Sequence, residues 1–427
     1  FEWNHHLFEC TLKSDTVESS EFEFEQELSR IQSLKPDTKR PSWQIHVLKN
    51  VISRGQCGTA LNHVAFVLHV HHWIADGISL FELLLHDLAD PIEKTNNVDT
   101  FRRTKSQQSR KGEKKHLFGS GKLVSFGSRI VHHATLFVRA YIDASIRLWI
   151  PDQRSPFALK AGAHLSGEKV VLSGARVDLP SLKSAARSAG LTIMETMLYT
   201  MTRAIQRYMR DDDLFPKGTK ERASNEQRLK STISLAIPFS FRQLSVNSLQ
   251  SVKNDVAVPY VTLPVNRSES KQQQQSVRSQ IQRFREGYTP RVVNFFMHIL
   301  AFLPRTIRNI LWWRACRRVS FVVSSLPPQN TQISIQGMPI ESIQYWAPTS
   351  GNVGPSVSVF SYNNEFWMGM RTDKATVPQP RLFLYYMYDE LSKFVDTYSE
   401  HGLVEYREAA QRLHRKARDD CVQPEYI

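Results

Sequence analysis

The segment His71-His72-Trp73-Ile74-Ala75-Asp76-Gly77 constrains this chain more than any other, because it lies where an apolar strand gives way to a helix. The preceding residues, 63–70, form a β-branched and apolar run that predicts a buried strand. The following residues, 78–88, place apolar side chains at helical spacing. Glycine tolerates backbone angles that other residues resist, so we expect Gly77 to permit a tight exit from strand to helix.

Paired imidazoles at the end of a buried strand suit proton transfer. A neutral imidazole titrates near working pH, so one of the two histidines can accept a proton from an attacking hydroxyl. Asp76 either orients an imidazole or pairs with a distant arginine to hold the turn, and we favour the second role. The chain offers an internal comparison in His132-His133, which no Asp-Gly follows and which lies in an amphipathic run, so we interpret that pair as structural.

Two blander or rival explanations apply to the same segment. The pair can simply end a strand, with Asp-Gly as an ordinary turn, although the strand-to-helix setting disfavours this. A metal site is the other rival, because His and Asp are common ligands. No Cys-x-x-Cys or His-Glu-x-x-His accompanies the segment, so we predict no metal.

Several further stretches accompany this segment. They are Arg40–Leu48 with Pro41-Ser42-Trp43, Ile237–Arg242, Asn254-Asp255 followed by Leu263-Pro264, Ser324–Pro328, Ile333–Ile340, Ser361-Tyr362 and Asp373. Together with the His-His-x-x-x-Asp-Gly motif they resemble the CoA-dependent acyltransferase superfamily, and specifically the wax ester synthase/diacylglycerol acyltransferase family of bacteria and plants. The resemblance runs from the first residues to about Leu391.

The resemblance implies an α+β fold of two chloramphenicol-acetyltransferase-like half-domains, which form a two-lobed sandwich with an active-site tunnel between them. We expect residues 1–165 to form the N-terminal half-domain, with the motif and a basic, amphipathic insertion. Residues 166–427 would form the second half-domain. Pro151–Pro156 marks a break between them.

The resemblance also implies the chemistry. The enzyme would transfer a long-chain acyl group from acyl-CoA, a co-substrate, to a fatty alcohol or diacylglycerol, giving wax ester or triacylglycerol, with no permanently bound cofactor. His72 would be the general base, His71 would position the turn, and Asp76 with Gly77 would shape it. Arg242 is the expected ion-pair partner of Asp76, and Asn254 the expected oxyanion or CoA contact.

Three departures from the family pattern keep another function open. Ser42 replaces a leucine, Met194-Glu195 replaces Asn-Asp, and Ser325 replaces an asparagine. The alternative is therefore a catalytically inactive, membrane-associated relative that binds lipid or CoA. A metal-dependent hydrolase is a third and weaker reading.

Net charge is +14, and the densest basic run is residues 102–115. This run is either a solvated loop or a site of attraction to anionic lipid headgroups. Nucleic acid ranks last, because no basic module interleaved with aromatic residues appears. The four cysteines are scattered at positions 10, 57, 316 and 421, which fits a reducing compartment.

Two amphipathic segments, residues 117–150 and 292–318, combine Trp and Phe with arginines. Both are too short to span a bilayer, and they suit helices lying in a membrane interface, with a core helix as the alternative. We therefore expect a membrane-associated protein at the endoplasmic reticulum or lipid droplet surface facing the cytoplasm. Because the chain starts at Phe1, we also expect a missing N-terminal segment.

Periodicity predicts the remaining elements. Strands are expected at residues 8–11, 43–48, 63–72, 170–172, 231–237, 256–263, 320–325, 333–336, 357–362 and 366–370, and helices from 79, from 179, at 194–209, 270–286 and 383–399. Residues 210–230 are predicted to be a polar loop.

Overall fold

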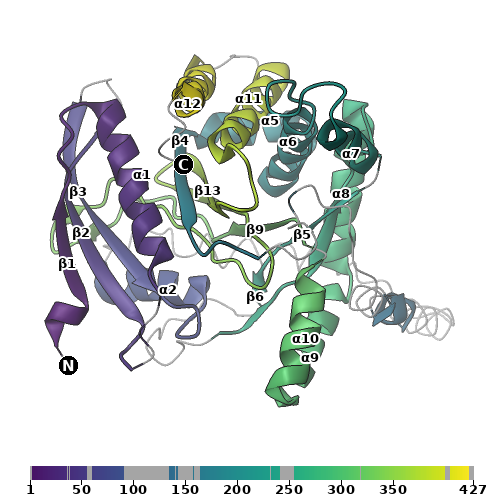
Figure 1. Cartoon of the computed structure of the whole chain (residues 1–427), viewed down its shortest axis with the longest axis horizontal. Coiled ribbons are helices and arrows are strands. Elements are labelled where there is room, and N and C mark those ends of the chain that lie inside the picture. Colours follow the sequence, from purple (N-terminus) through teal and green to yellow (C-terminus); the bar gives the residue numbers. More distant parts are fainter. Residues whose placement is uncertain are drawn as a thin grey trace, which may run out of the picture.

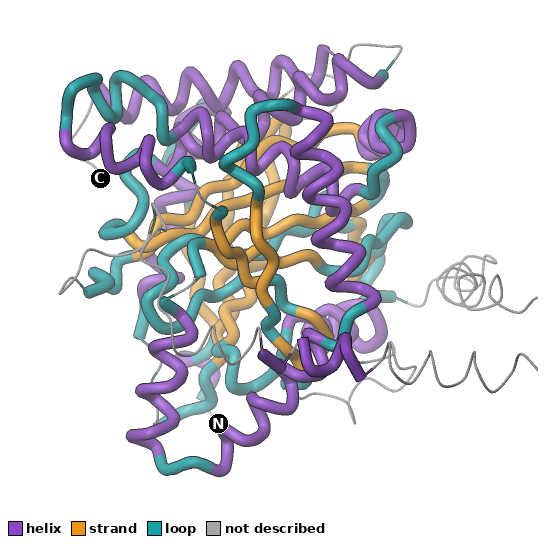
Figure 2. The backbone as a smooth tube through the Cα atoms, turned by 90° about the vertical axis from the view of Figure 1, so that its right-hand side faces the viewer, coloured by secondary structure: helices purple, strands orange, loops and turns teal. Residues whose placement is uncertain are grey.

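The computed structural model describes residues 2–35, 37, 39–54, 60–90, 134–139, 141–142, 157, 164–230, 232–240, 254–317, 319–399 and 404–422. These residues form two lobes that lie side by side (Figure 1). A three-stranded sheet organises the first lobe and a six-stranded sheet organises the second. In the side view the strands lie at the centre and the helices surround them (Figure 2).

The N-terminal sheet has the strand order β1-β2-β3, with β1 at Leu7–Thr11, β2 at Trp43–Arg54 and β3 at Ala60–Val70. β1 is parallel to β2, and β2 is antiparallel to β3. Helix α1 (Val17–Ser33) packs against β2, and a short helix, α2 (Gly77–Leu83), follows β3 and continues as a π-helical turn at Leu84–Leu88. β3 is therefore an edge strand that leads directly into the motif.

The C-terminal sheet has the order β4-β13-β12-β9-β5-β8, in which β9 is parallel to β5 and to β12 and the other pairs are antiparallel. Its strands are β4 (Lys169–Asp178), β5 (Ile233–Ala236), β8 (Tyr260–Leu263), β9 (Phe321–Ser325), β12 (Ser356–Tyr362) and β13 (Glu365–Asp373). Two small ribbons join β6 (Phe239–Ser240) to β7 (Val256–Ala257), and β10 (Ser334–Ile335) to β11 (Met338–Pro339).

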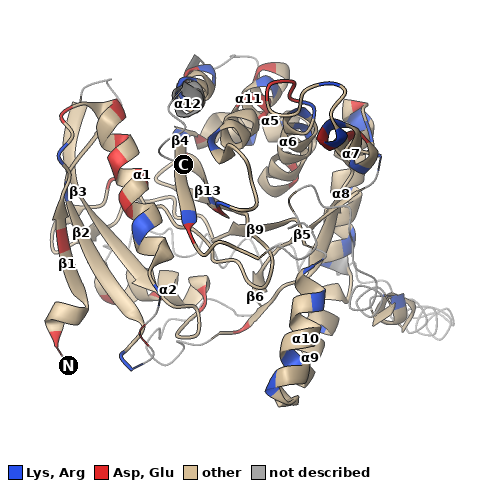
Figure 3. Cartoon of the chain, viewed as in Figure 1, with Lys and Arg blue, Asp and Glu red and all other residues tan. Residues whose placement is uncertain are grey.

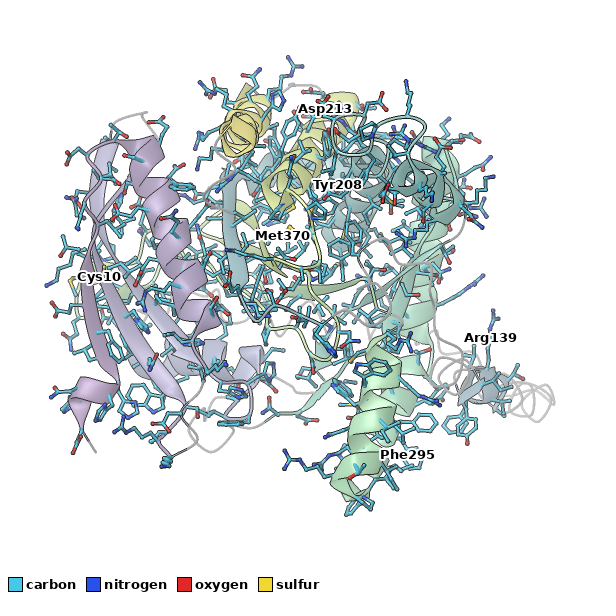
Figure 4. All side chains as sticks on the ribbon, viewed as in Figure 1. Cys10, Arg139, Tyr208, Asp213, Phe295 and Met370 are labelled. Atoms are coloured by element: carbon cyan, nitrogen blue, oxygen red, sulfur yellow. The ribbon has the colours of Figure 1, made fainter. Side chains whose placement is uncertain are left out.

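Helices cover one face of the larger sheet. They include α5 (Leu179–Ser188), α6 (Ile193–Tyr208) and α11 (Pro380–Tyr398), while α12 (Val404–Val422) packs on α11. On β13, alternate residues Phe366, Met368 and Met370 join this helical core, and Figure 4 places Met370 in the interior. Because neighbouring strand residues point to opposite faces, Trp367 and Arg371 face the N-terminal lobe.

Helix α1 fastens the two lobes together along the free edge of β4. Three backbone N–H groups on alternate β4 residues donate to α1 side chains one helical turn apart: Lys169 to Ser33 Oγ (2.8 Å), Val171 to Ser29 Oγ (2.9 Å) and Ser173 to Glu25 Oε1 (2.8 Å). The other Glu25 oxygen pairs with the buried Arg381 guanidinium at 2.6 Å. These contacts satisfy an edge strand without a further strand.

The remaining helices lie at the far side of the C-terminal lobe: α7 (Lys220–Arg228), α8 (Ser270–Glu286), α9 (Thr289–Phe302) and α10 (Arg305–Cys316). The α9–α10 hairpin projects from the rest of the lobe (Figure 1). Its connection is short because Pro304 separates the two helices.

Most strands and the helices at 79, 179, 194–209, 270–286 and 383–399 are confirmed to within a few residues. The predicted strand at 256–263 is wrong in one respect, since Pro259 separates β7 from β8. The predicted loop at 210–230 is also wrong at its end, where Thr219 caps α7. Of the insertion, the basic run 102–115 and the pair His132-His133 lie outside the described residues.

The two sheets use separate parts of the sequence, residues 7–70 and residues 169–373. We therefore propose residues 1–165 and 166–427 as the two half-domains. Phe81 of α2 nevertheless packs against Phe360 and Trp367 of the C-terminal lobe. The lobes thus share a small apolar cluster beside the motif.

Candidate active site

Residues 71–77, called the motif turn below, connect the end of β3 to the start of α2. The His71 N–H donates to the Ser42 carbonyl at 2.9 Å, and the His71 carbonyl accepts from the Ile74 N–H at 3.0 Å. Ser42 is the residue that departs from the family's Pro-Leu-Trp pattern, and it contributes here through its backbone. The departure therefore leaves the anchoring of the motif turn intact.

Asp76 holds the motif turn from a fully buried position, with 0% of its surface exposed. It is the N-cap of α2, and its Oδ1 accepts from the Ser79 N–H at 2.8 Å and the Ser79 hydroxyl at 2.9 Å. Its Oδ2 accepts from the Asp255 N–H at 2.9 Å. The expected partner, Arg242, lies outside the described residues. Asp76 thus holds the turn through hydrogen bonds that reach both lobes.

Asn254 continues this contact from the second lobe. Its side-chain Nδ2 donates to the His72 carbonyl at 2.6 Å. The amide nitrogen that sequence reasoning assigned to an oxyanion or to CoA is therefore engaged with the backbone beside His72. This geometry favours a role for Asn254 in positioning the histidine.

The two histidines differ in environment. His71 is half-buried, its ring centroid lies 3.9 Å from that of Trp73, and its Nδ1 accepts from the Trp73 N–H at 3.3 Å. Burial, and then the neighbouring His72, lower the pKa of His71, which keeps it neutral at working pH. The His72 side chain is more exposed. His72 is therefore the more accessible of the two imidazoles for a substrate hydroxyl.

Both histidines line a cavity of about 2770 Å³ between the lobes. The N-terminal lobe contributes β3, α1 and α2, while the C-terminal lobe contributes residues of β5, β9, the α9–α10 hairpin and the segment 338–350. Asn254 and Arg371 also line the cavity. The base expected from the sequence consequently faces a space that both lobes enclose. Of the residues that the structure describes, no cluster of three His, Cys, Asp or Glu is placed to hold a metal ion.

Gly77 serves the motif turn for a different reason from the one expected. Its backbone is not in the left-handed region, so the predicted need for unusual angles is wrong. A Cβ at this position would lie 3.3 Å from Leu326 Cδ2, which is tighter than most side-chain contacts. Gly77 therefore permits close approach of α2 to the C-terminal lobe.

The other departures from the family pattern lie in different surroundings. Glu195 completes a capping box with Thr192 at the start of α6, where each residue bonds the backbone of the other. Ser325 ends β9 and lines the cavity. The Met194-Glu195 change is accounted for by helix capping, whereas the Ser325 change alters the cavity wall.

Sequence reasoning missed one charged residue of the cavity wall. Arg371 lies on β13, far from the motif in sequence, and no local pattern distinguishes it from a surface arginine. Only the alternation of β13, with Met370 and Thr372 as its neighbours, hints that it is buried.

Comparison with known protein families decides the assignment. The wax ester synthase/diacylglycerol acyltransferase catalytic domain matches residues 1–197, and the C-terminal domain of the same family matches residues 252–394. The chain belongs to this family. It is an O-acyltransferase, so the predicted family and enzyme class are confirmed.

Named relatives agree with this assignment. A Mycobacterium tuberculosis protein named "Probable diacyglycerol O-acyltransferase tgs1" is 22% identical, over 87% of this chain and 75% of its own length. The Arabidopsis thaliana protein "Wax ester synthase/diacylglycerol acyltransferase 10" is also 22% identical, over 87% of this chain and 77% of its own length.

Among solved structures, the wax ester synthase/diacylglycerol acyltransferase from Marinobacter aquaeolei VT8 superposes with a TM-score of 0.58. The match has 15% sequence identity and covers 93% of this chain and 80% of the other. The predicted two-lobed α+β fold of this acyltransferase family is confirmed.

Proposed function

We propose that this family member transfers a long-chain acyl group from acyl-CoA to the hydroxyl of a fatty alcohol or diacylglycerol, with His72 as the general base. The observation that carries the proposal is the accessible His72 imidazole at the wall of the 2770 Å³ cavity, on a turn fixed from both lobes. The cavity wall is largely apolar around β3 and the α9–α10 hairpin, which suits long hydrocarbon chains.

The reaction needs one base and no covalent enzyme intermediate. His72 takes the proton from the acceptor hydroxyl while the oxygen attacks the thioester carbonyl, forming the new C–O bond. The C–S bond then breaks, and the departing CoA sulfur receives the proton from the His72 imidazolium. The hydrogen bonds of Asn254 and Asp76 keep the backbone beside His72 fixed, which preserves the alignment of the base with the hydroxyl.

The direct test incubates the purified protein with radiolabelled palmitoyl-CoA and either hexadecanol or dipalmitoylglycerol, and separates neutral lipids by thin-layer chromatography. We expect labelled wax ester, triacylglycerol or both, with one CoA released for each ester formed. Binding of palmitoyl-CoA without ester formation from either acceptor would instead support the inactive, lipid-binding alternative.

The α9–α10 hairpin supports docking on a membrane surface as part of this function. Large apolar side chains are exposed on it, including Phe295, Phe302, Ile307, Ile310 and Trp313. Figure 4 shows Phe295 on the projecting part of the hairpin, and Figure 3 shows basic residues along both helices. The sequence contains no acidic residue between Glu286 and Glu341, so the hairpin complements anionic headgroups.

The hairpin also lines the cavity through Val293, Met297 and Leu311, so an acceptor dissolved in a membrane would enter beside it. Part of the other amphipathic segment lies against this region, where Tyr141 stacks on Phe296. None of the described helices has the length and apolarity to cross a bilayer. A lipid droplet or endoplasmic reticulum surface facing the cytoplasm would present both the headgroups and the acceptors that this proposal requires.

A further inference from the structure

Arg371 is a buried cation in the wall of the cavity. It lies on β13, it is only 7% exposed, and it faces the N-terminal lobe. Its Nε donates to Gln32 Oε1 at 3.1 Å and its Nη1 donates to Thr349 Oγ1 at 3.2 Å. Both partners are neutral. A guanidinium carries five N–H donors, so most of its hydrogen-bonding capacity remains available.

No carboxylate among the described residues forms an ion pair with Arg371. Asp373, two residues along β13, is already engaged, since it accepts from Lys169 Nζ, Ser166, Gly167 and Ala375. The imidazole nearest in charge is His69, whose pKa is lowered by burial and then by Arg371 itself. His69 is therefore neutral and does not balance the guanidinium.

An unpaired buried charge is costly, whereas a neutral side chain could make the same two hydrogen bonds to Gln32 and Thr349. Arg381 provides the contrast within the same protein, because its buried guanidinium pairs with Glu25 at 2.6 Å. Burial lowers the pKa of Arg371 to about 10, so it keeps its charge at neutral pH. The missing partner of Arg371 is therefore an anion that enters the cavity.

We propose that Arg371 binds an anionic group of a substrate, a carboxylate or a phosphate, inside the cavity. A planar guanidinium matches both groups through paired N–H donors. His69 lies on β3 two residues before His71, and it also lines the cavity, so the proposed site adjoins the motif turn. The anion belongs either to CoA or to an acceptor that carries an acidic group. The inference rests on the proposed acyl transfer and specifies its substrate chemistry.

The test compares wild type with Arg371→Gln, using two matched substrate pairs. Palmitoyl-CoA is compared with palmitoyl-N-acetylcysteamine, which has the same thioester without phosphates. The acceptor 16-hydroxyhexadecanoate is compared with hexadecanol, which lacks the carboxylate. We expect Arg371→Gln to lower kcat/KM at least tenfold for the anionic member of one pair, through KM, while the neutral member changes less than twofold. The affected pair identifies the source of the anion.

Two controls separate recognition from structure. Arg176→Gln also removes a cation from the cavity wall, but that arginine is paired with Glu365, so both selectivity ratios should stay as in wild type. Arg371→Lys, which restores the charge, should recover part of the preference. Unchanged ratios in Arg371→Gln, or an equal loss with all four substrates, would overturn the proposal.

A binding measurement keeps the inference separable from the proposed reaction. Inorganic phosphate, at constant ionic strength against chloride, should raise the thermal midpoint of wild type and of Arg176→Gln more than that of Arg371→Gln. An equal rise in all three proteins would contradict anion binding at Arg371. An enzyme that shows this difference but forms no ester would refute the acyl transfer while retaining the anion site.

Discussion

Replacing Asp76 with asparagine tests how the two lobes fix the motif turn. The two carboxylate oxygens accept from different backbone donors, Ser79 N–H and Asp255 N–H. An asparagine keeps one acceptor and gains an NH₂ group, so it can still cap α2 through Ser79. The NH₂ group then faces the Asp255 N–H, and two buried donors are left opposed.

A buried donor without an acceptor costs about 1–3 kcal/mol, and a hydrogen bond to a charged group contributes about 1.5–3 kcal/mol. We therefore expect Asp76→Asn to lower the free energy of unfolding by about 3 kcal/mol, measured by urea denaturation with tryptophan fluorescence. Detachment of Asp255 would also lower kcat. Ser79→Ala is the matched control, since it removes only the hydroxyl contact and should cost about 1 kcal/mol. An Asp76→Asn protein with wild-type stability and kcat would refute this account of the turn.

Three further predictions concern other parts of the molecule. Asn254→Ala removes the donor to the His72 carbonyl and should lower kcat by about tenfold with unchanged circular dichroism; full activity would exclude a positioning role. Burial, with Arg30 next, lowers the pKa of His46 to about 4, so only the unfolded chain gains a proton as pH falls below 6.5. Stability should therefore drop by up to about 3 kcal/mol toward pH 4. His46→Leu should weaken this dependence, and an identical slope would contradict it. Phe302→Asp should reduce flotation with anionic vesicles severalfold, unlike Phe22→Asp on α1, and equal flotation would argue against hairpin docking.

Sequence reasoning located the motif turn because its signal is local. The strand before His71 and the helix after Gly77 follow from side-chain periodicity. The role of Asp76 in holding the turn was also accessible, because an N-cap aspartate acts on residues three positions away. The second contact, from Asp255, joins residues far apart in sequence and needed the folded chain.

Helices α1 and α12 were missed for a physical reason. The start of α1 reads Glu-Phe-Glu-Phe, which alternates with the period of a strand, and its helical character is set by Thr16 as N-cap. Its residues Glu25, Ser29 and Ser33 are polar because they bind the edge of β4. A polar stripe that satisfies another strand's backbone resembles a solvent-facing surface in the sequence.

The central claim is that His72 deprotonates the acceptor at the cavity wall. Initial rates of ester formation from palmitoyl-CoA by His72→Ala, with its folding checked by circular dichroism and urea denaturation, test this most directly. The account predicts a folded protein whose rate falls by about 10²–10⁴-fold, the usual contribution of a general base. A folded His72→Ala protein that forms ester at a rate within a few fold of wild type would contradict it.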